Sequence, residues 1–244
     1  MQFQYRDVDQ EGLVTLDAIS SADKFNKWIY DAITPFCQGT ILEIGSGIGN
    51  ISQFFIREKK EIYLSDIRMN YREIVKDKFG LDDQRVLDID IVRPDFNDVY
   101  AALLGKFDSV FCLNVVEHIK EDHTAIDNMV KLLKPGGKLT VLVPAYQALY
   151  NHFDVTLEHY RRYNRQTLVS LMSKHGTLIR VFNFNFVGIF GWFVSGKLLG
   201  NKILPTNEVK LFNYLVPINK VIDRLLCRKV GLSVVCVISK HPQT

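Results

Sequence analysis

Residues 41–50 combine an acid, three glycines and an apolar run in a spacing that suits ligand binding. The segment reads ILEIGSGIGN, so Glu43 is followed by Gly45, Ser46, Gly47 and Gly49. Glycine accepts positive φ angles and lets a ligand approach the backbone. A strand that turns sharply into a helix presents backbone N–H groups to whatever lies in the crevice. The segment therefore predicts a site for the nucleotide part of a cofactor, with a tight turn that binds no ligand as the alternative.

A second acid ends the next apolar run. Asp66 follows Ile62–Ser65 and precedes Ile67. A carboxylate at the tip of the second strand can accept hydrogen bonds from both ribose hydroxyls of a nucleoside. Asp66 thus supports a nucleoside cofactor without identifying it, and an aspartate that caps a helix or forms a turn is the alternative.

Strand and helix patterns alternate from about Thr40 onward and would position these two acids. Strands are predicted at Thr40–Ile44, Ile62–Leu64, Arg85–Leu87, Ser109–Leu113, Lys138–Val143, Phe182–Phe186 and Leu232–Ser239. Helices are predicted at Ala22–Pro35, Tyr71–Phe79, His123–Leu133 and Gln166–His175. Such alternation is typical of an α/β fold, in which helices cover both faces of a parallel sheet.

The composition restricts the classes of protein that need consideration. With 244 residues and 47% apolar content, the chain is expected to form one globular domain over residues 1–244. The chain has 30 Lys and Arg and 27 Asp and Glu, which gives a net charge of +3. This near balance gives little support to a nucleic-acid-binding protein, which usually has a strongly basic face. The four cysteines form no Cys-x-x-Cys pair and are expected to be buried free thiols. The chain begins without an apolar leader, and no apolar stretch reaches the roughly 20 residues that span a bilayer, so we expect a cytoplasmic protein.

Five motifs between Glu43 and Tyr163 follow the order found in class I S-adenosylmethionine (SAM)-dependent methyltransferases. The turn at residues 43–49 resembles motif I of that family, and Leu132–Leu139 resembles its "LkPGG" turn. The segment Phe107–Ile119 resembles the "nvlEH" segment of the small-molecule enzymes of the family, which include quinone-type O-methyltransferases. Asp154–Tyr163 resembles a segment that follows strand five in many bacterial members of that group.

The resemblance covers about residues 22–187 and the last strand, and it implies both a fold and a cofactor. The implied fold is a doubly wound, Rossmann-like sheet of seven strands, in which the last strand is antiparallel. The residues implied to bind SAM are Glu43, Gly45, Ser46, Gly47, Gly49, Asp66, Ile67, Asp88, Ile89, Asn114 and Val115. Asp88 would accept a hydrogen bond from the adenine amino group and Ile89 would lie against the ring. A turn-forming role is the alternative for Asp88, with Asp90 as the alternative acid, and Asn114 and Val115 would approach the methionine portion.

The resemblance also assigns residues to the acceptor side. His118 would lie near the transferred methyl, where a neutral imidazole with a reference pKa of ~6.5 can take a proton from a hydroxyl. His159 and Arg162 would bind or deprotonate a polar acceptor, and Tyr163 would stack on it. The alternatives are that Glu117 and His118 only cap and pack the following helix, and that His159 lies in a solvated basic turn.

The chain departs from the family between its last two strands, which the family joins by a nearly direct hairpin. Residues 188–230 are expected to form an inserted helical cap, in which lysines and arginines are interspersed among aromatic and aliphatic residues. The favoured interpretation is a subdomain that buries its own apolar face. The other interpretation is a lid over an apolar acceptor, with Trp192 binding substrate, or a surface that rests peripherally on a membrane.

These motifs predict SAM-dependent methyl transfer to a small molecule, with a hydroxyl on an apolar or lipid-like acceptor preferred. Asn114–Glu117 stands where amino-methylating enzymes have an Asn-Pro-Pro-Tyr type motif, so a nucleic-acid partner is not expected. No grouping of histidines and carboxylates compels a metal, and none is predicted. An NAD-dependent oxidoreductase on a Rossmann fold and a non-catalytic SAM-binding protein remain as alternatives, although the glycine spacing and the Pro135–Gly137 turn disfavour the oxidoreductase. The sequence does not indicate an oligomeric state.

Overall fold

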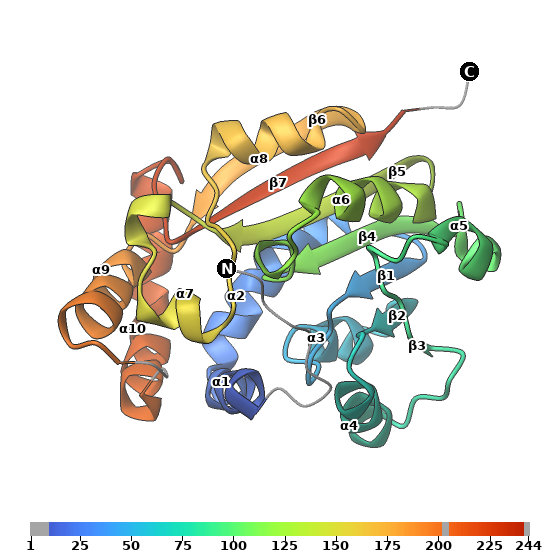
Figure 1. Ribbon diagram of the computed structural model, residues 1–244. Helices are drawn as coiled ribbons and strands as arrows, with labels where there is room; N and C mark the ends of the chain where they lie inside the picture. Colours follow the sequence, from blue (N-terminus) through green and yellow to red (C-terminus); the bar gives the residue numbers. More distant parts are fainter. Residues whose placement is uncertain (1–9, 202–204, 242–244) are drawn as a thin grey trace.

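One mixed β-sheet with helices on both faces organises the chain (Figure 1). The computed structural model describes residues 10–201 and 205–241. Its seven strands have the order β3-β2-β1-β4-β5-β7-β6, and β7 runs antiparallel to both of its neighbours while the other pairs are parallel. The strands are β1 (Ile41–Ile44), β2 (Ile62–Ser65), β3 (Val86–Leu87), β4 (Phe107–Leu113), β5 (Leu133–Pro144), β6 (Gly176–Phe184) and β7 (Ser233–Lys240). The predicted α/β fold and its antiparallel last strand are confirmed.

The helices form two layers, with α5, α6 and α8 on one face of the sheet and α2, α3, α4 and α10 on the other. The α-helices are α1 (Gln10–Ser20), α2 (Asp23–Ile33), α3 (Ser52–Arg57), α4 (Met69–Phe79), α5 (Phe96–Val99), α6 (Asp122–Leu132), α7 (His152–Thr156), α8 (Arg165–Met172), α9 (Gly188–Trp192) and α10 (Thr206–Leu225). The short helices are η1 (Thr34–Phe36), η2 (Ala101–Leu103), η3 (Val116–His118), η4 (Gln147–Leu149) and the π-helix η5 (Phe193–Leu198). Within β7, Val234, Cys236 and Ile238 join the first layer and Val235 and Val237 the second, because successive side chains of a strand point to opposite faces.

Two strands, β5 and β6, begin at least five residues before the positions that the sequence predicts. β5 begins at Leu133 rather than Lys138, because Leu133 pairs with Phe107 across a register shift at the Pro-Gly-Gly turn. β6 begins at Gly176 and is an edge strand, so residues 177–180 pair with β7 on one side only and are exposed. They lack the apolar alternation that marks a half-buried strand, which is why the sequence did not reveal this half of β6.

All four cysteines are free thiols, and Cys37, Cys112 and Cys236 are buried as predicted. The prediction is wrong for Cys227, which is exposed. This cysteine follows α10 at a φ of 51°, where the chain turns at the surface before β7.

The carboxyl ends of the parallel strands meet at one edge of the sheet, which is where doubly wound folds bind ligands. In Figure 1 the arrowheads of β4 and β5 point towards the side where α7, α9 and α10 gather. The predicted insertion, residues 188–230, holds α9, η5 and α10, and α10 packs against α1 and α2. Among the described residues, no helix is both long and apolar enough to cross a bilayer. Dinucleotide-binding sheets usually have the order 3-2-1-4-5-6, so a seventh strand inserted beside β5 disfavours the NAD alternative.

Candidate functional site

The glycine turn between β1 and α3 has a backbone that only glycine adopts readily. Gly45, Gly47 and Gly49 have φ angles of 72°, 52° and 76°. A Cβ at Gly45 would lie 2.3 Å from Cγ2 of Val115, and a Cβ at Gly47 would lie 2.9 Å from Cδ1 of Leu16. The turn therefore touches the segment after β4 on one side and α1 on the other. The sequence motif predicted the turn, but nothing local to it reveals the contact with α1.

Two buried acids hold this turn in place. Asp66, which is 5% exposed, accepts hydrogen bonds from the backbone N–H of Gly47 (3.0 Å) and of Arg68 (2.9 Å). Burial raises the pKa of Asp66, although these two N–H groups oppose the shift. Glu43 lies in β1, just before the turn, and its carboxylate accepts a hydrogen bond from the Ser52 hydroxyl at the start of α3. Burial raises the pKa of Glu43 to about 8, against the opposing effect of that hydroxyl.

Several buried polar atoms around the turn lack a hydrogen-bond partner among the residues that the structure describes. They are Oγ of Ser46, Oδ1 of Asn50 and Oδ1 of Asn70. Buried polar groups in proteins are nearly always paired, because an unpaired one costs about 1–3 kcal/mol. The turn and the start of α4 therefore present polar atoms that a nucleoside with hydroxyl and amino groups can satisfy.

An arginine that the sequence analysis missed connects the ends of β2 and β3. Nη1 of Arg72 donates to the carbonyls of Asp66 (2.8 Å) and Ile67 (3.0 Å), and Nη2 lies 3.0 Å from Asp88. Asp88 and Ile67 are both exposed and accessible to a ligand. Ile89 is 2% exposed and packs in the core, so its contact with an adenine ring stays a prediction.

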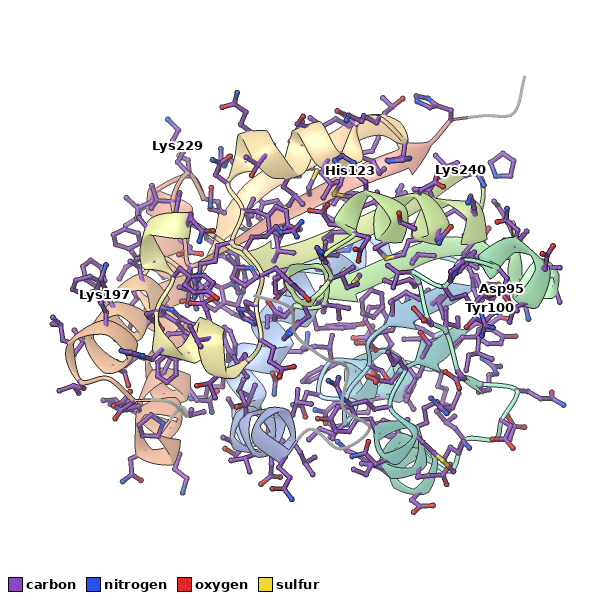
Figure 2. All side chains as sticks on the ribbon, viewed as in Figure 1. Asp95, Tyr100, His123, Lys197, Lys229 and Lys240 are labelled. Atoms are coloured by element: carbon purple, nitrogen blue, oxygen red, sulfur yellow. The ribbon has the colours of Figure 1, made fainter. Side chains whose placement is uncertain are left out.

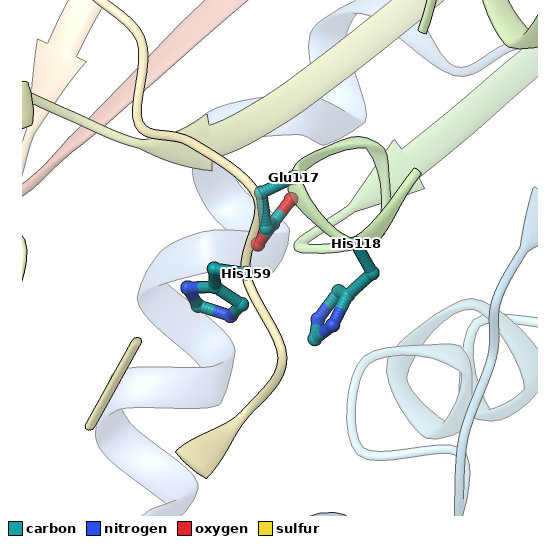
Figure 3. A group of neighbouring side chains, drawn as sticks. All are labelled: Glu117, His118 and His159. Atoms are coloured by element: carbon teal, nitrogen blue, oxygen red, sulfur yellow. The ribbon is translucent and has the colours of Figure 1, made fainter. Parts of the chain in front are cut away.

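The segment after β4 joins the cofactor side to a cluster of polar side chains. Asn114 follows the strand with a φ of 53° and is exposed, and Val115 comes next, against Gly45. Figure 3 shows Glu117, His118 and His159 facing one another across the gap between η3 and the chain after α7. The two imidazole rings meet edge to face, with 4.5 Å between centroids. The cluster brings together both histidines that the sequence analysis predicted.

Asp154 on α7 fixes the position of His159. Its Oδ1 lies 2.8 Å from Nδ1 of His159 and 2.7 Å from Nε of Arg162, and all three side chains are buried. Burial alone would raise the pKa of Asp154, but the hydrogen bonds to His159 and Arg162 outweigh it and lower the pKa. An ionised Asp154 only accepts hydrogen bonds, so Nδ1 of His159 carries the proton and Nε2 is left as an acceptor.

Both histidines are held in the neutral form. Burial lowers the pKa of His159, and the hydrogen bond to Asp154 offsets the shift only in part. His118 is exposed to solvent, yet the protein around it lowers its pKa well below the ordinary value, and the nearby His159 and Arg68 add to that shift. A neutral His118 at this exposed position can accept a proton at pH 7.

Glu117 is the third member of the cluster and has an unusual environment. It is fully buried, and within the described ranges 10–201 and 205–241 neither carboxylate oxygen has a hydrogen-bond partner. Burial raises its pKa to about 8, while the charge of Arg162 opposes the shift. One donor atom from each of Glu117, His118 and His159 lies within 4.8 Å of the others, so this group has the composition of a site for a divalent cation. The sequence analysis predicted no metal, because His159 is distant from the other two residues along the chain.

Replacing Glu117 by glutamine should stabilise the chelator-treated protein at alkaline pH. A carboxyl whose pKa rises from 4.5 to about 8 on folding favours the folded state in acid, and that advantage is lost as the pH rises through 8. Glutamine removes this loss, so Glu117→Gln should gain at least about 1 kcal/mol at pH 9 and almost nothing at pH 4.5. Urea unfolding at both pH values measures the difference, with Glu121→Gln at an exposed position as the matched control. Equal gains at the two pH values would contradict the assignment.

The predicted acceptor residues divide into two groups. Nη1 of Arg162 donates to the carbonyl of Ala145 (3.1 Å), and the guanidinium lies 4.6 Å from the ring centroid of Trp192. Trp192 therefore lies near the cluster, and its indole Nε1 is buried without a partner. Tyr163 is buried and donates its hydroxyl to Asp122 on α6 (2.8 Å), so it packs in the core and does not join the cluster. Stacking of Tyr163 on an acceptor stays a prediction that this placement disfavours.

A surface hollow of about 420 Å³ lies away from these residues, between α5 and α6. It is lined by polar and basic side chains, including Arg93, His123 and His175. None of the predicted site residues lines it. The chemistry therefore points to the carboxyl edge of the sheet rather than to this hollow.

Comparisons with known proteins identify relatives of this chain. Residues 42–139 match the family described as "Methyltransferase domain". The ubiquinone biosynthesis O-methyltransferase of Xanthomonas oryzae pv. oryzae is 28% identical over 99 residues, which cover 41% of this chain and 40% of that protein. The enzyme of the same name from Xylella fastidiosa is 25% identical over 107 residues, covering 44% of this chain and 42% of its own length. The chain thus spans about two fifths of the length of the curated relatives that it matches.

Solved structures share the fold at low sequence identity. A chain in the complex of the Haloferax volcanii Trm112 methyltransferase activator with a methyltransferase has a TM-score of 0.62 and 13% identity, covering 98% of this chain and 100% of that one. A SAM-dependent methyltransferase from Archaeoglobus fulgidus has a TM-score of 0.56 and 17% identity, covering 88% of this chain and 94% of that one. Phosphoethanolamine N-methyltransferase 2 of Haemonchus contortus, bound to S-adenosylhomocysteine, has a TM-score of 0.55 and 19% identity, covering 90% of this chain and 52% of that one.

Proposed function

We propose that this chain, whose residues 42–139 match the methyltransferase-domain family, is a SAM-dependent methyltransferase that transfers a methyl group from SAM to a hydroxyl of a small apolar molecule. SAM supplies a methyl group that its sulfonium already activates. The residues of the chain then have to hold the donor and acceptor atoms about 3 Å apart and to exclude water. The acceptor oxygen forms the new bond to the methyl carbon, the carbon–sulfur bond breaks to leave S-adenosylhomocysteine, and the hydroxyl proton needs a base.

One observation carries the proposal: the glycine turn and the histidine cluster are joined by four consecutive residues. Val115 lies against Gly45, and η3 then delivers His118 beside His159. A methyl group held over the turn is thereby brought close to a neutral imidazole. His118, which is exposed, is the group that takes the proton, and the buried His159 positions it.

The character of the acceptor is inferred from the relatives and from the insertion. The curated relatives act, by name, in ubiquinone biosynthesis as O-methyltransferases. Trp192 of α9 lies beside Arg162 near the cluster, and α9 is rich in apolar residues. Both features favour an apolar acceptor with a hydroxyl group over a nucleic acid.

A second role for the cluster follows from Glu117. Its unpartnered carboxylate, together with the two histidines, would hold a divalent cation that polarises the acceptor hydroxyl and so replaces His118 as the agent of deprotonation. Asp154 would not bind the cation itself. It would orient His159 by accepting a hydrogen bond from Nδ1 of that imidazole, as carboxylates commonly do for metal-bound histidines. Dependence of turnover on added Mg²⁺ or Zn²⁺ after chelation distinguishes this role from that of a free base.

His118→Ala should lower kcat by 10²–10⁴-fold while leaving the affinity for S-adenosylhomocysteine unchanged, because general-base catalysis contributes in that range. Release of S-adenosylhomocysteine in the presence of a panel of phenols and catechols measures turnover. His123→Ala is the matched control, since His123 is an exposed histidine on α6 outside the cluster (Figure 2). Full turnover in His118→Ala would leave proximity alone as the source of catalysis. Tight SAM binding without turnover on any acceptor would favour the non-catalytic alternative.

A further inference from the structure

Helix α10 exposes a continuous apolar stripe. Its members are Leu211, Tyr214, Ile218, Val221 and Leu225, which are 61%, 73%, 58%, 52% and 77% exposed. Successive members are three or four residues apart, which places them on one face of the helix. An exposed apolar face of this length marks an interaction site more often than it marks an ordinary surface.

The inward face of α10 carries polar residues that anchor the helix. Oδ1 of Asn213 accepts from the backbone N–H of Phe25 on α2 (3.1 Å). The carboxylate of Asp223 accepts from the N–H groups of Asn185 (2.7 Å) and Phe186 (2.8 Å). These bonds fix the orientation of α10, so its apolar stripe cannot simply rotate inward. The expectation that the insertion buries its own apolar face is therefore wrong for this stripe.

Positive charge is concentrated in the same segment. Residues 188–230 contain seven Lys and Arg against two Asp and Glu, a net charge of +5, while the whole chain carries only +3. One of the two acids, Asp223, is buried and bonded to backbone N–H groups, so it offsets little of the surface charge. Lys210 and Arg224 are exposed and follow one flank of the stripe. Figure 2 shows Lys197 and Lys229 projecting from the end of the molecule that α9 and α10 form.

A second set of exposed apolar side chains lies in the same insertion. It consists of Phe190, Phe193, Val194, Leu198 and Leu199 on α9 and η5 and just after them. Figure 1 shows α9 and α10 at the same end of the molecule. Aromatic and aliphatic side chains beside basic ones are typical of a helix that lies in the interface of a membrane.

We infer that this surface, the α10 stripe with its flanking lysines and arginines, binds an anionic lipid bilayer, with α10 lying in the plane of the interface. The charge favours anionic headgroups over a second copy of the chain, since the segment that forms this surface, residues 188–230, carries a net charge of +5. Two such segments would repel each other, whereas anionic headgroups attract Lys210 and Arg224 beside the stripe, although Lys220 is paired with Asp31 (3.3 Å). The inference does not require the proposed methyl transfer. If both hold, contact through Trp192 and Arg162 places the histidine cluster next to the membrane-bound end, where a lipid-dissolved acceptor can enter.

Co-sedimentation of the full chain with vesicles tests the inference. Binding is expected to vesicles of phosphatidylcholine with about one third phosphatidylglycerol, and to weaken strongly in 0.5 M salt or without the anionic lipid. Ile218→Glu/Leu225→Glu should lower binding at least 10-fold, and Lys210→Glu or Arg224→Glu roughly fivefold each. Val99→Glu is the matched control, because Val99 is 48% exposed on α5 at the far end of the molecule.

Every outcome of the vesicle co-sedimentation experiment either supports or overturns membrane binding by α10. Wild-type protein that stays in the supernatant with anionic vesicles overturns the inference, as does binding that Val99→Glu weakens as much as the α10 variants do. Loss of a dimer in Ile218→Glu/Leu225→Glu, with no vesicle binding by wild type, would assign the stripe to a second copy of the chain. Thermal stabilisation of every variant by S-adenosylhomocysteine shows that the variants are folded. A failure of that stabilisation in wild type would instead count against the proposed function, so the two failures are distinguishable.

Discussion

Gly45→Ala is expected to lose at least 10-fold in affinity for S-adenosylhomocysteine and to unfold at a lower temperature than wild type. Gly45 has a φ of 72°, a region that costs an L-residue about 1–2 kcal/mol. The added Cβ would also lie 2.3 Å from Cγ2 of Val115, so the turn or the segment after β4 must move. Both segments are predicted to hold the cofactor, and their displacement should therefore weaken binding. Isothermal titration calorimetry and thermal unfolding measure the two effects.

Two controls separate backbone strain from the overlap of atoms. Gly136 has a φ of 75° but no atom within 4 Å of a built Cβ, so Gly136→Ala should lose stability while keeping its affinity for the cofactor. Val115→Ala removes Cγ2 and leaves Cβ 3.5 Å from the new methyl, an ordinary contact. Adding Val115→Ala to Gly45→Ala should therefore recover part of the lost affinity. Strictly additive losses in this cycle would contradict the close approach of the two segments.

Asp154→Ala is expected to lower the stability of the chain by roughly 3–5 kcal/mol, because it leaves the positive charge of Arg162 buried without the carboxylate that neutralises it. Arg162 is 6% exposed, and its Nε lies 2.7 Å from Oδ1 of Asp154. For a chain of this size the loss amounts to roughly 6–20 °C in the midpoint of thermal unfolding. His159 loses its hydrogen-bond partner in the same variant, so turnover should fall even where the protein remains folded.

The chain offers a matched surface pair for this experiment. Nε of Arg93 lies 2.6 Å from Oδ1 of Asp95, a spacing close to that of the buried pair, but both side chains are largely exposed. Exposed ion pairs are screened by water and contribute little, so Asp95→Ala should leave the unfolding midpoint unchanged. Similar midpoints for Asp154→Ala and Asp95→Ala would show that the buried pair contributes no more than the exposed one.

Features encoded by neighbouring residues could be predicted from the sequence. The glycine turn and Asp66 each follow a short apolar strand, and the structure brings them together through the hydrogen bond from Gly47 to Asp66. The antiparallel last strand came from the resemblance to the family rather than from any local pattern. The first half of β6 was missed, because an edge strand exposed over residues 177–180 does not need alternating apolar residues.

Features that depend on tertiary contacts could not be predicted in the same way. Glu117 and His159 meet only because the chain after α7 returns to η3, where the backbone N–H of Tyr160 donates to the carbonyl of Glu117 (2.8 Å). The hydrogen bonds of Asp154 to His159 and Arg162 could not be predicted for the same reason. The three residues are close in sequence, but only the folded turn brings their side chains together. The helical periodicity of α10 showed apolar residues but not which face the fold would bury. The hydrogen bonds of the half-buried Asn213 and the buried Asp223 decide that orientation.

Thermal unfolding with candidate cofactors shows whether the carboxyl edge of this sheet binds SAM. The purified chain would be unfolded with SAM, S-adenosylhomocysteine, NAD or NADP, each at the same concentration, about 100 times a plausible dissociation constant for a cofactor. A ligand at that excess adds ~2.7 kcal/mol, or roughly 5–11 °C for a chain of this size. We expect that shift with SAM and S-adenosylhomocysteine and none with the nicotinamide cofactors. A shift with NAD or NADP alone would contradict the interpretation of the Gly45–Gly49 turn and of the methyl-transfer function with it.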